Sequence, residues 1–104
     1  MSARRIIFVG AVPIAVKRAF NSLEPTDLGE VILWREAVAR LCLDCVGETG
    51  ISKPSYHNKL VREARNFVRL DPAFETMCDF AGLEPSALKR PLLSVKPFMH
   101  PEVP

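Results

Sequence analysis

The stretch FETMCDFAGLEPSALKRPL, residues 74–92, decides the expected fold of this 104-residue chain. Apolar side chains recur at helical spacing in its first half, at Phe74, Met77, Cys78 and Ala81. Gly82 then interrupts the pattern, as glycine commonly does after the last turn of a helix. Pro85 begins a second short helix, which we expect to end at Arg90 because Pro91 lacks a backbone N–H. The stretch therefore predicts two helices joined by a turn of about three residues.

Two helices joined by a short turn that contains glycine are typical of a helix-turn-helix unit, whose second helix lies in the major groove of DNA. The outward-facing side chains of the predicted second helix are Ser86, Lys89 and Arg90. We take these three residues as candidate contacts to base edges or phosphates. Three nearby carboxylates argue against this interpretation because they would repel the DNA backbone: Glu75, Asp79 and Glu84. The alternative is a helical corner that ends in a glycine cap and has no role in binding.

Residues 56–70 precede this stretch and have an amphipathic pattern with a basic face. The positive side chains of that face are Lys59, Arg62, Arg65 and Arg69. Lysine and arginine along one helix face can neutralise several phosphates, so these four residues are candidate DNA-backbone contacts. A face of this kind can also be simply solvated, or paired with acids such as Asp71. We expect His57, at the start of this helix, to be a surface or capping residue.

Residues 27–47 predict the longest helix of the chain. Asp27 and Glu30 form a capping pair at its start, and Gly47 is suited to its C-terminal end. One stripe of apolar side chains follows the helical period: Val31, Trp34, Val38, Leu41 and Cys45. Further apolar residues lie off this stripe, so we expect other elements to cover the helix on more than one side at the centre of the core. Residues 71–72, Asp-Pro, open the helix that follows the basic segment.

These segments predict an all-α fold, a small bundle of about four helices with a helix-turn-helix-like C-terminal unit. We expect an apolar and basic N-terminal arm over residues 1–22, one helical domain over residues 23–92 and an extended, Pro-rich tail over residues 93–104. A strand over residues 5–9 is an alternative for part of the arm. The apolar run over residues 6–16 is shorter than the roughly 20 residues that a membrane-spanning helix needs, so we expect no stable membrane insertion.

The charge balance does not by itself assign a partner. The chain has 14 Lys and Arg residues against 12 Asp and Glu residues, a formal net charge of +2 that is too small to argue for nucleic-acid binding. The charges are nevertheless separated into blocks. Positive residues predominate in segments 1–20 and 53–69, and negative residues predominate in segments 21–48 and 71–84. Any electrostatic argument therefore rests on the distribution of charge.

The three cysteines are Cys42, Cys45 and Cys78. An odd number without a convincing export signal favours reduced thiols and a cytoplasmic location. Two cysteines at C-x-x-C spacing can bind zinc or act in redox chemistry. Redox pairs lie at helix N-termini, however, whereas this pair lies near the end of a long predicted helix, so we expect core residues and no metal. With two histidines, no glycine-rich phosphate loop and no nucleophile elbow, we expect neither an enzyme nor a cofactor.

A further pattern covers residues 31–92. It consists of Trp34-x-x-Ala37-Val38 followed by Asp44, then Glu63-Ala64 and Phe67, and then Phe74-x-x-Met77-Cys78-x-x-Ala81-Gly82-Leu83-x-Pro85. This pattern resembles short uncharacterised helical proteins of bacteriophages, prophages and phage-like elements of alphaproteobacteria. The Ala-Gly-Leu-x-Pro turn is similar to the turn of the helix-turn-helix predicted for those proteins. The resemblance implies a small phage-type regulatory or DNA-associated protein, and it transfers no catalytic residue.

Two hypotheses follow for the function. The first is a small helix-turn-helix-like DNA-binding protein of phage or prophage type that acts in transcription regulation or DNA packaging. The second is a non-enzymatic adaptor or inhibitor that docks on a larger host or phage protein through the apolar arm, the Pro-rich tail or the basic helix. A homodimer would serve either function, since two-fold symmetry can pair recognition units or create a groove for a partner.

Overall fold

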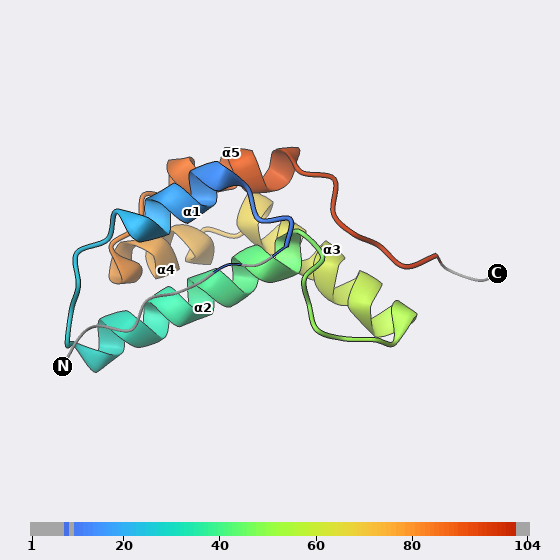
Figure 1. The fold of residues 1–104 in the computed structure, drawn as a ribbon, viewed down its shortest axis with the longest axis horizontal. Coiled ribbons are helices and arrows are strands. Elements are labelled where there is room, and N and C mark those ends of the chain that lie inside the picture. Colours follow the sequence, from blue (N-terminus) through green and yellow to red (C-terminus); the bar gives the residue numbers. More distant parts are fainter. Residues whose placement is uncertain (1–7, 9, 102–104) are drawn as a thin grey trace.

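The computed structural model describes residues 8 and 10–101, and all regular structure within them is helical. Figure 1 shows the five helices, α1 (Ile14–Asn21), α2 (Gly29–Cys45), α3 (Pro54–Leu70), α4 (Ala73–Ala81) and α5 (Pro85–Ser94). The prediction of an all-α fold is confirmed, with one helix more than expected. The strand considered for residues 5–9 falls outside the described residues except for Phe8, and so does the end of the predicted tail after residue 101.

The additional helix is α1, which packs against α5 and runs beside it in Figure 1. Val16 and Phe20 lie one turn apart on α1, and both are buried in the core together with Val12. Phe8 adds an edge-to-face contact to Phe20, with 4.8 Å between the ring centroids. Among the described residues, the core therefore includes Val12, Val16 and Phe20, which the sequence pattern placed in a separate arm.

Local sequence signals set several helix ends as predicted. Gly82 adopts a left-handed conformation with φ of +78°, and Leu83 N donates a hydrogen bond of 2.8 Å to Cys78 O. Gly47, with φ of +92°, ends α2 in the same way. The Asp71 side chain accepts a hydrogen bond of 2.9 Å from Ala73 N at the start of α4. These three residues act within one turn of their own helix, which is why the sequence reveals them.

The predicted cap at Asp27 is wrong, because α2 begins at Gly29 and Leu28 occupies the capping position without a side-chain bond. Thr26 accepts the hydrogen bond from Leu28 N instead, at 3.1 Å. Arg35 also donates a hydrogen bond of 2.8 Å to Glu24 O, so a contact from the helix itself holds the preceding linker. A tertiary contact thus replaces the local signal at this end.

The predicted helix end at Arg90 is also wrong, because α5 continues through Pro91 to Ser94. Leu88 and Leu92 lie one turn apart on either side of Pro91, and both are fully buried. Arg65 of α3 donates hydrogen bonds to Leu92 O and Leu93 O near the end of the helix. Burial and these bonds favour the continued helix over the break that proline alone would favour.

Helix α2 contacts α4, α3 and α5, but its two halves differ in burial. Residues 38–45 contain five buried residues, and residues 29–37 contain none. Figure 1 shows the beginning of α2 at one end of the molecule, whereas its end lies beside α3. The prediction that the whole helix lies at the centre of the core therefore holds only for its C-terminal half.

Candidate functional site

The candidate nucleic-acid interface consists of α4, α5 and the exposed face of α3. Helices α4 and α5 are joined by Gly82, Leu83 and Glu84, and the side chain of Leu83 is buried in the core. Leu83 therefore anchors the turn, while the left-handed Gly82 lets the chain reverse within three residues. The arrangement presents the first turns of α5 at the surface, beside α4.

The three predicted contacts on α5 differ in their surroundings. Arg90 is exposed and lies one turn after Ser86, so both side chains share one exposed face. Ser86 Oγ donates a hydrogen bond of 3.1 Å to Glu84 Oε1. Lys89 Nζ lies 3.4 Å from Glu75 Oε1 of α4 in an ion pair. The acids that argued against DNA binding in the sequence therefore engage two of the three candidates.

On α3, the structure places Lys59, Arg62 and Arg69 at the surface along one face. Lys59 Nζ lies 3.9 Å from Glu63 Oε1, and Arg69 donates a hydrogen bond to Asn66 Oδ1. Exposed pairs of this kind contribute about 0–1 kcal/mol and break easily, so they leave the positive charges available to a ligand.

Arg65 points inward, unlike the other predicted residues of the basic face. Its guanidinium donates hydrogen bonds to Cys45 O at 3.0 Å, Leu92 O at 3.1 Å and Leu93 O at 2.9 Å. These carbonyls lie at the C-terminal ends of α2 and α5, where helices leave backbone oxygens without intrahelical partners. Arg65 therefore joins three helices, and its guanidinium is not part of the exposed basic face.

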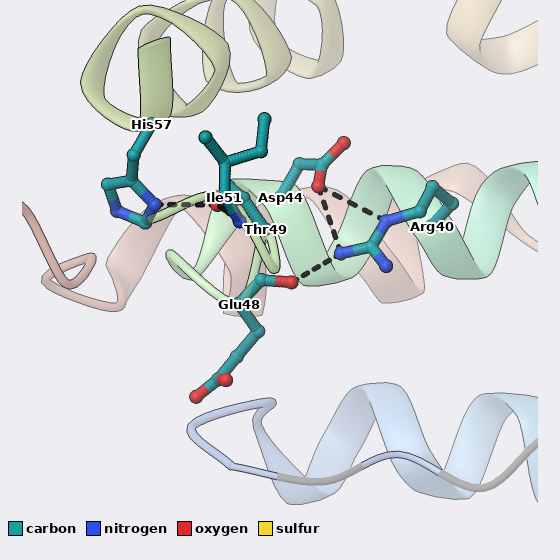
Figure 2. A network of polar contacts seen from close by, with 6 residues as sticks. All are labelled: Arg40, Asp44, Glu48, Thr49, Ile51 and His57. Carbon is teal, nitrogen blue, oxygen red and sulfur yellow. Dashed lines mark hydrogen bonds and ion pairs between the residues drawn. The ribbon is translucent and has the colours of Figure 1, made fainter. Parts of the chain in front are cut away.

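His57 is buried, so the expected surface position is wrong. A carbonyl oxygen only accepts, so Nε2 donates the 2.8 Å hydrogen bond to Phe98 O. In the neutral ring Nδ1 then accepts from Thr49 Oγ1 at 2.6 Å, as drawn in Figure 2. Thr49 Oγ1 also accepts a hydrogen bond from Ile51 N, so the ring is tied to the loop between α2 and α3.

Asn58 continues this contact with the segment after α5. Its Nδ2 donates to His100 O and its Oδ1 accepts from His100 N, both at 2.9 Å. Phe98 N donates to Val46 O, and a Cβ at Gly47 would lie only 2.5 Å from Phe98 O. The residues after α5 are therefore bound to the start of α3 and the end of α2. No sequence signal indicates this pairing, because the bonded residues lie more than 40 positions apart.

Figure 2 also shows an ion pair beside this histidine. Arg40 Nη2 lies 3.0 Å from Asp44 Oδ1, and the same guanidinium donates a hydrogen bond to Glu48 O. Burial raises the pKa of Asp44, while the positive charge of Arg40, its hydrogen bond and the nearby His57 oppose that rise. The network connects the end of α2 with the following loop and α3, and we assign it to the framework of the fold.

The three cysteines are free and buried. Burial raises the pKa of Cys42, and the neighbouring Cys45 and Cys78 add to the effect. Burial likewise raises the pKa of Cys45 to about 12 and that of Cys78 to about 11. Thiols with such pKa values are protonated at neutral pH and are weak nucleophiles, so they act here as small core residues.

Within residues 8 and 10–101, no group of three or more His, Cys, Asp or Glu residues is arranged to hold a metal ion. In the same part of the chain, no helix combines the length and apolar character needed to cross a membrane. An open groove lies between the end of α3 and the start of α4, lined by Glu63, Asn66, Phe67, Leu70, Asp71 and Pro72. No family model, curated protein or solved structure matches this chain.

Proposed function

We propose that this protein binds DNA through α4 and α5, with α3 contacting the phosphate backbone, and acts in transcription regulation or DNA packaging. The observation that carries the proposal is the three-residue turn at Gly82, which leaves Ser86 and Arg90 exposed on one face of α5. In helix-turn-helix proteins this face of the second helix meets base edges. The resemblance of residues 31–92 to phage-type proteins supports the same class of function.

The acidic side chains near α5 affect how much each basic residue of this helix can contribute to DNA binding. Arg90 is the candidate base contact, because arginine can donate two hydrogen bonds to guanine and its exposed guanidinium has no hydrogen bond or ion pair with the described residues. Lys89 would exchange the carboxylate of Glu75 for a phosphate, at a cost of about 0–1 kcal/mol for an exposed pair. Glu75 would then face the DNA without its partner, which makes Lys89 a weaker contributor than Arg90.

The backbone contacts come from the exposed face of α3, which contains Lys59, Arg62 and Arg69. Helix α3 packs against both α4 and α5, so a protein held by α5 brings this helix close to the duplex. Each phosphate that a lysine or arginine neutralises releases counterions, and the affinity therefore falls as salt rises. Arg65 takes no part in this set, because its guanidinium binds three carbonyls of the protein.

The test is fluorescence anisotropy of labelled random-sequence duplex DNA across a salt series, followed by selection of a preferred sequence. We expect Arg62→Ala to weaken binding to every sequence and to lower the salt slope by about one. Arg90→Ala should cost about 1–3 kcal/mol on the preferred sequence and less on random DNA. The matched control is Lys96→Ala, which removes one exposed charge from the segment after α5.

Two results would contradict the proposal. One is the absence of binding at low salt by a protein whose circular dichroism spectrum is helical. The other is an equal loss of affinity in Lys96→Ala, Arg62→Ala and Arg90→Ala, because that would indicate attraction by net charge without a defined interface.

A further inference from the structure

The N-terminal half of α2 and the neighbouring α4 present an apolar face that the proposed DNA interface does not use. Leu33, Trp34, Ala37 and Leu41 fall within one arc of α2 by their helical spacing. Phe80 of α4 lies against this arc, with 5.3 Å between its ring centroid and that of Trp34. We call this set, Leu33, Trp34, Ala37, Leu41 and Phe80, the α2–α4 face.

The α2–α4 face is incompletely covered by the described protein. Leu33 is 65% exposed and Phe80 is 51% exposed, and the other three side chains are half-buried. Burying a leucine or phenylalanine side chain contributes about 1.5–3 kcal/mol, so the exposed atoms represent unused binding energy. Grouped exposed apolar side chains that include aromatic residues are typical of protein-binding surfaces.

The charges at the edge of the α2–α4 face are negative. Glu30 is exposed and lies one turn before Leu33 and Trp34 on the same arc, and Asp79 is exposed next to Phe80. Residues 24–36 contain four carboxylates and a single arginine, and α4 adds Asp79, while its other carboxylate, Glu75, is paired with Lys89 of α5. This edge therefore attracts cationic side chains.

Only one of the two positive side chains of α2, Arg35, lies among these carboxylates, and its single charge offsets only part of theirs. Arg35 donates hydrogen bonds to Ala81 O and Glu24 O. Arg40 is paired with Asp44 at 3.0 Å. The edge formed by Glu30 and Asp79 consequently keeps its negative character next to the exposed Leu33 and Phe80.

We propose that the α2–α4 face binds a cationic amphipathic helix of a partner protein. Apolar anchors at i, i+3, i+4 and i+7 of the partner helix would cover Leu33, Trp34 and Phe80, and its lysine or arginine residues would face Glu30 and Asp79. A second copy of this chain fits less well. Its basic helix α3 exposes large apolar side chains only near its two ends, at Tyr56 and Leu70, and therefore lacks a matching apolar stripe.

The test uses Trp34, which is the single tryptophan of the chain and belongs to the α2–α4 face. The probe is a synthetic Leu/Lys peptide of about 18 residues with the helical apolar spacing, long enough to form a helix when bound. Its matched control is a Leu/Glu peptide with the same spacing, and neither contains an aromatic residue. Titration of the full chain should give a saturable shift of the Trp34 emission to shorter wavelength with the Leu/Lys peptide.

The expected affinity for the Leu/Glu peptide is at least tenfold lower, and added salt should reduce this difference. Phe80→Ser and Leu33→Ser should each weaken binding of the Leu/Lys peptide, whereas Leu70→Ser, at an exposed leucine of α3, should not. Asp79→Lys should weaken binding of the Leu/Lys peptide and strengthen that of the Leu/Glu peptide. All four positions are exposed, so these variants keep the fold.

Three outcomes would overturn the proposal. The first is no saturable change with either peptide, and the second is equal affinity for both peptides. The third is a concentration-dependent shift of the Trp34 emission without peptide, which would identify a second copy of this chain as the occupant. The result can be separated from the DNA measurement, because Leu33→Ser on α2 changes no charge and leaves Arg62 and Arg90 in place.

Discussion

The two halves of α2 belong to one continuous helix but have opposite surroundings. Residues 38–45 bury Val38, Cys42 and Cys45 completely, whereas Leu33 in residues 29–37 is 65% exposed. Both halves are rich in apolar residues. The comparison shows that hydrophobicity specifies which side chains can be buried, while the neighbouring elements decide which of them are buried.

The neighbours of the two halves explain the difference. The C-terminal end of α2 is tied to α3 through Arg65 and Cys45 O, and the segment after α5 binds to it at Val46. The N-terminal half is held mainly by α4, through the Trp34–Phe80 contact and the hydrogen bond from Arg35 to Ala81 O. One half is therefore surrounded by several elements, and the other leaves Leu33 exposed beside Phe80.

The largest expected effect comes from removing the residue that ties the buried half to its neighbours. Arg65→Met keeps the apolar stem but leaves three backbone carbonyls without their donor. We expect a loss of about 3 kcal/mol in the free energy of unfolding, measured by urea denaturation. The control Arg69→Met, at an exposed position of the same helix, should stay within about 0.5 kcal/mol of the wild type. Similar losses in both variants would show that Arg65 does not hold the helices together.

A direct comparison of the two halves uses one truncation in each. Val38→Ala removes two buried methyl groups and leaves a cavity, so we expect a loss of about 2 kcal/mol in the free energy of unfolding. Leu33→Ala removes more carbon atoms but from an exposed position, and we expect a loss within about 0.5 kcal/mol. Thermal and urea unfolding of both variants would check this. A larger loss for Leu33→Ala would mean that another part of the chain covers the α2–α4 face.

The smallest expected effect concerns Asp44 in the buried half of α2, and how the free energy of unfolding changes with pH. Burial raises the pKa of Asp44 above its usual value of 3.8, which means that folding disfavours the ionised carboxylate. Its contribution to stability is therefore fully present below pH 3.8 and is lost as the pH rises through the raised pKa. Urea unfolding across the acidic pH range should show that the free energy of unfolding of Asp44→Asn lacks this loss as the pH rises. An unchanged pH profile in Asp44→Asn would assign the decline to another group.

Much of the fold could be predicted because its signals are local. The left-handed Gly82 and Gly47 and the capping Asp71 each act on backbone groups within one turn. The helical spacing of the apolar residues predicted α2, α3 and α4 within a few residues of their observed bounds. The prediction that Pro91 ends the last helix was wrong, because the effect of proline was judged for an isolated helix. In the folded protein, burial of Leu92 and the hydrogen bonds from Arg65 stabilise α5 beyond Pro91.

The candidate site was predictable only as a set of residue types. Sequence spacing placed Arg62, Arg65 and Arg69 on one basic face, yet it could not reveal that carbonyls of α2 and α5 bind the guanidinium of Arg65. The ion pair between Lys89 and Glu75 joins two helices and is likewise invisible to helical periodicity. Which charges remain available to a ligand depends on partners that are distant in the sequence.

The sequence by itself determined the helical class, several helix ends and the separation of charge, because backbone caps and apolar spacing act over a few residues. The tertiary structure alone decided that His57 and Asn58 bind the segment after α5, that Arg65 faces inward and that the described residues cover the N-terminal half of α2 only in part. These features depend on contacts between segments far apart in the chain. Their free energies arise only when the helices pack, so no local pattern can encode them.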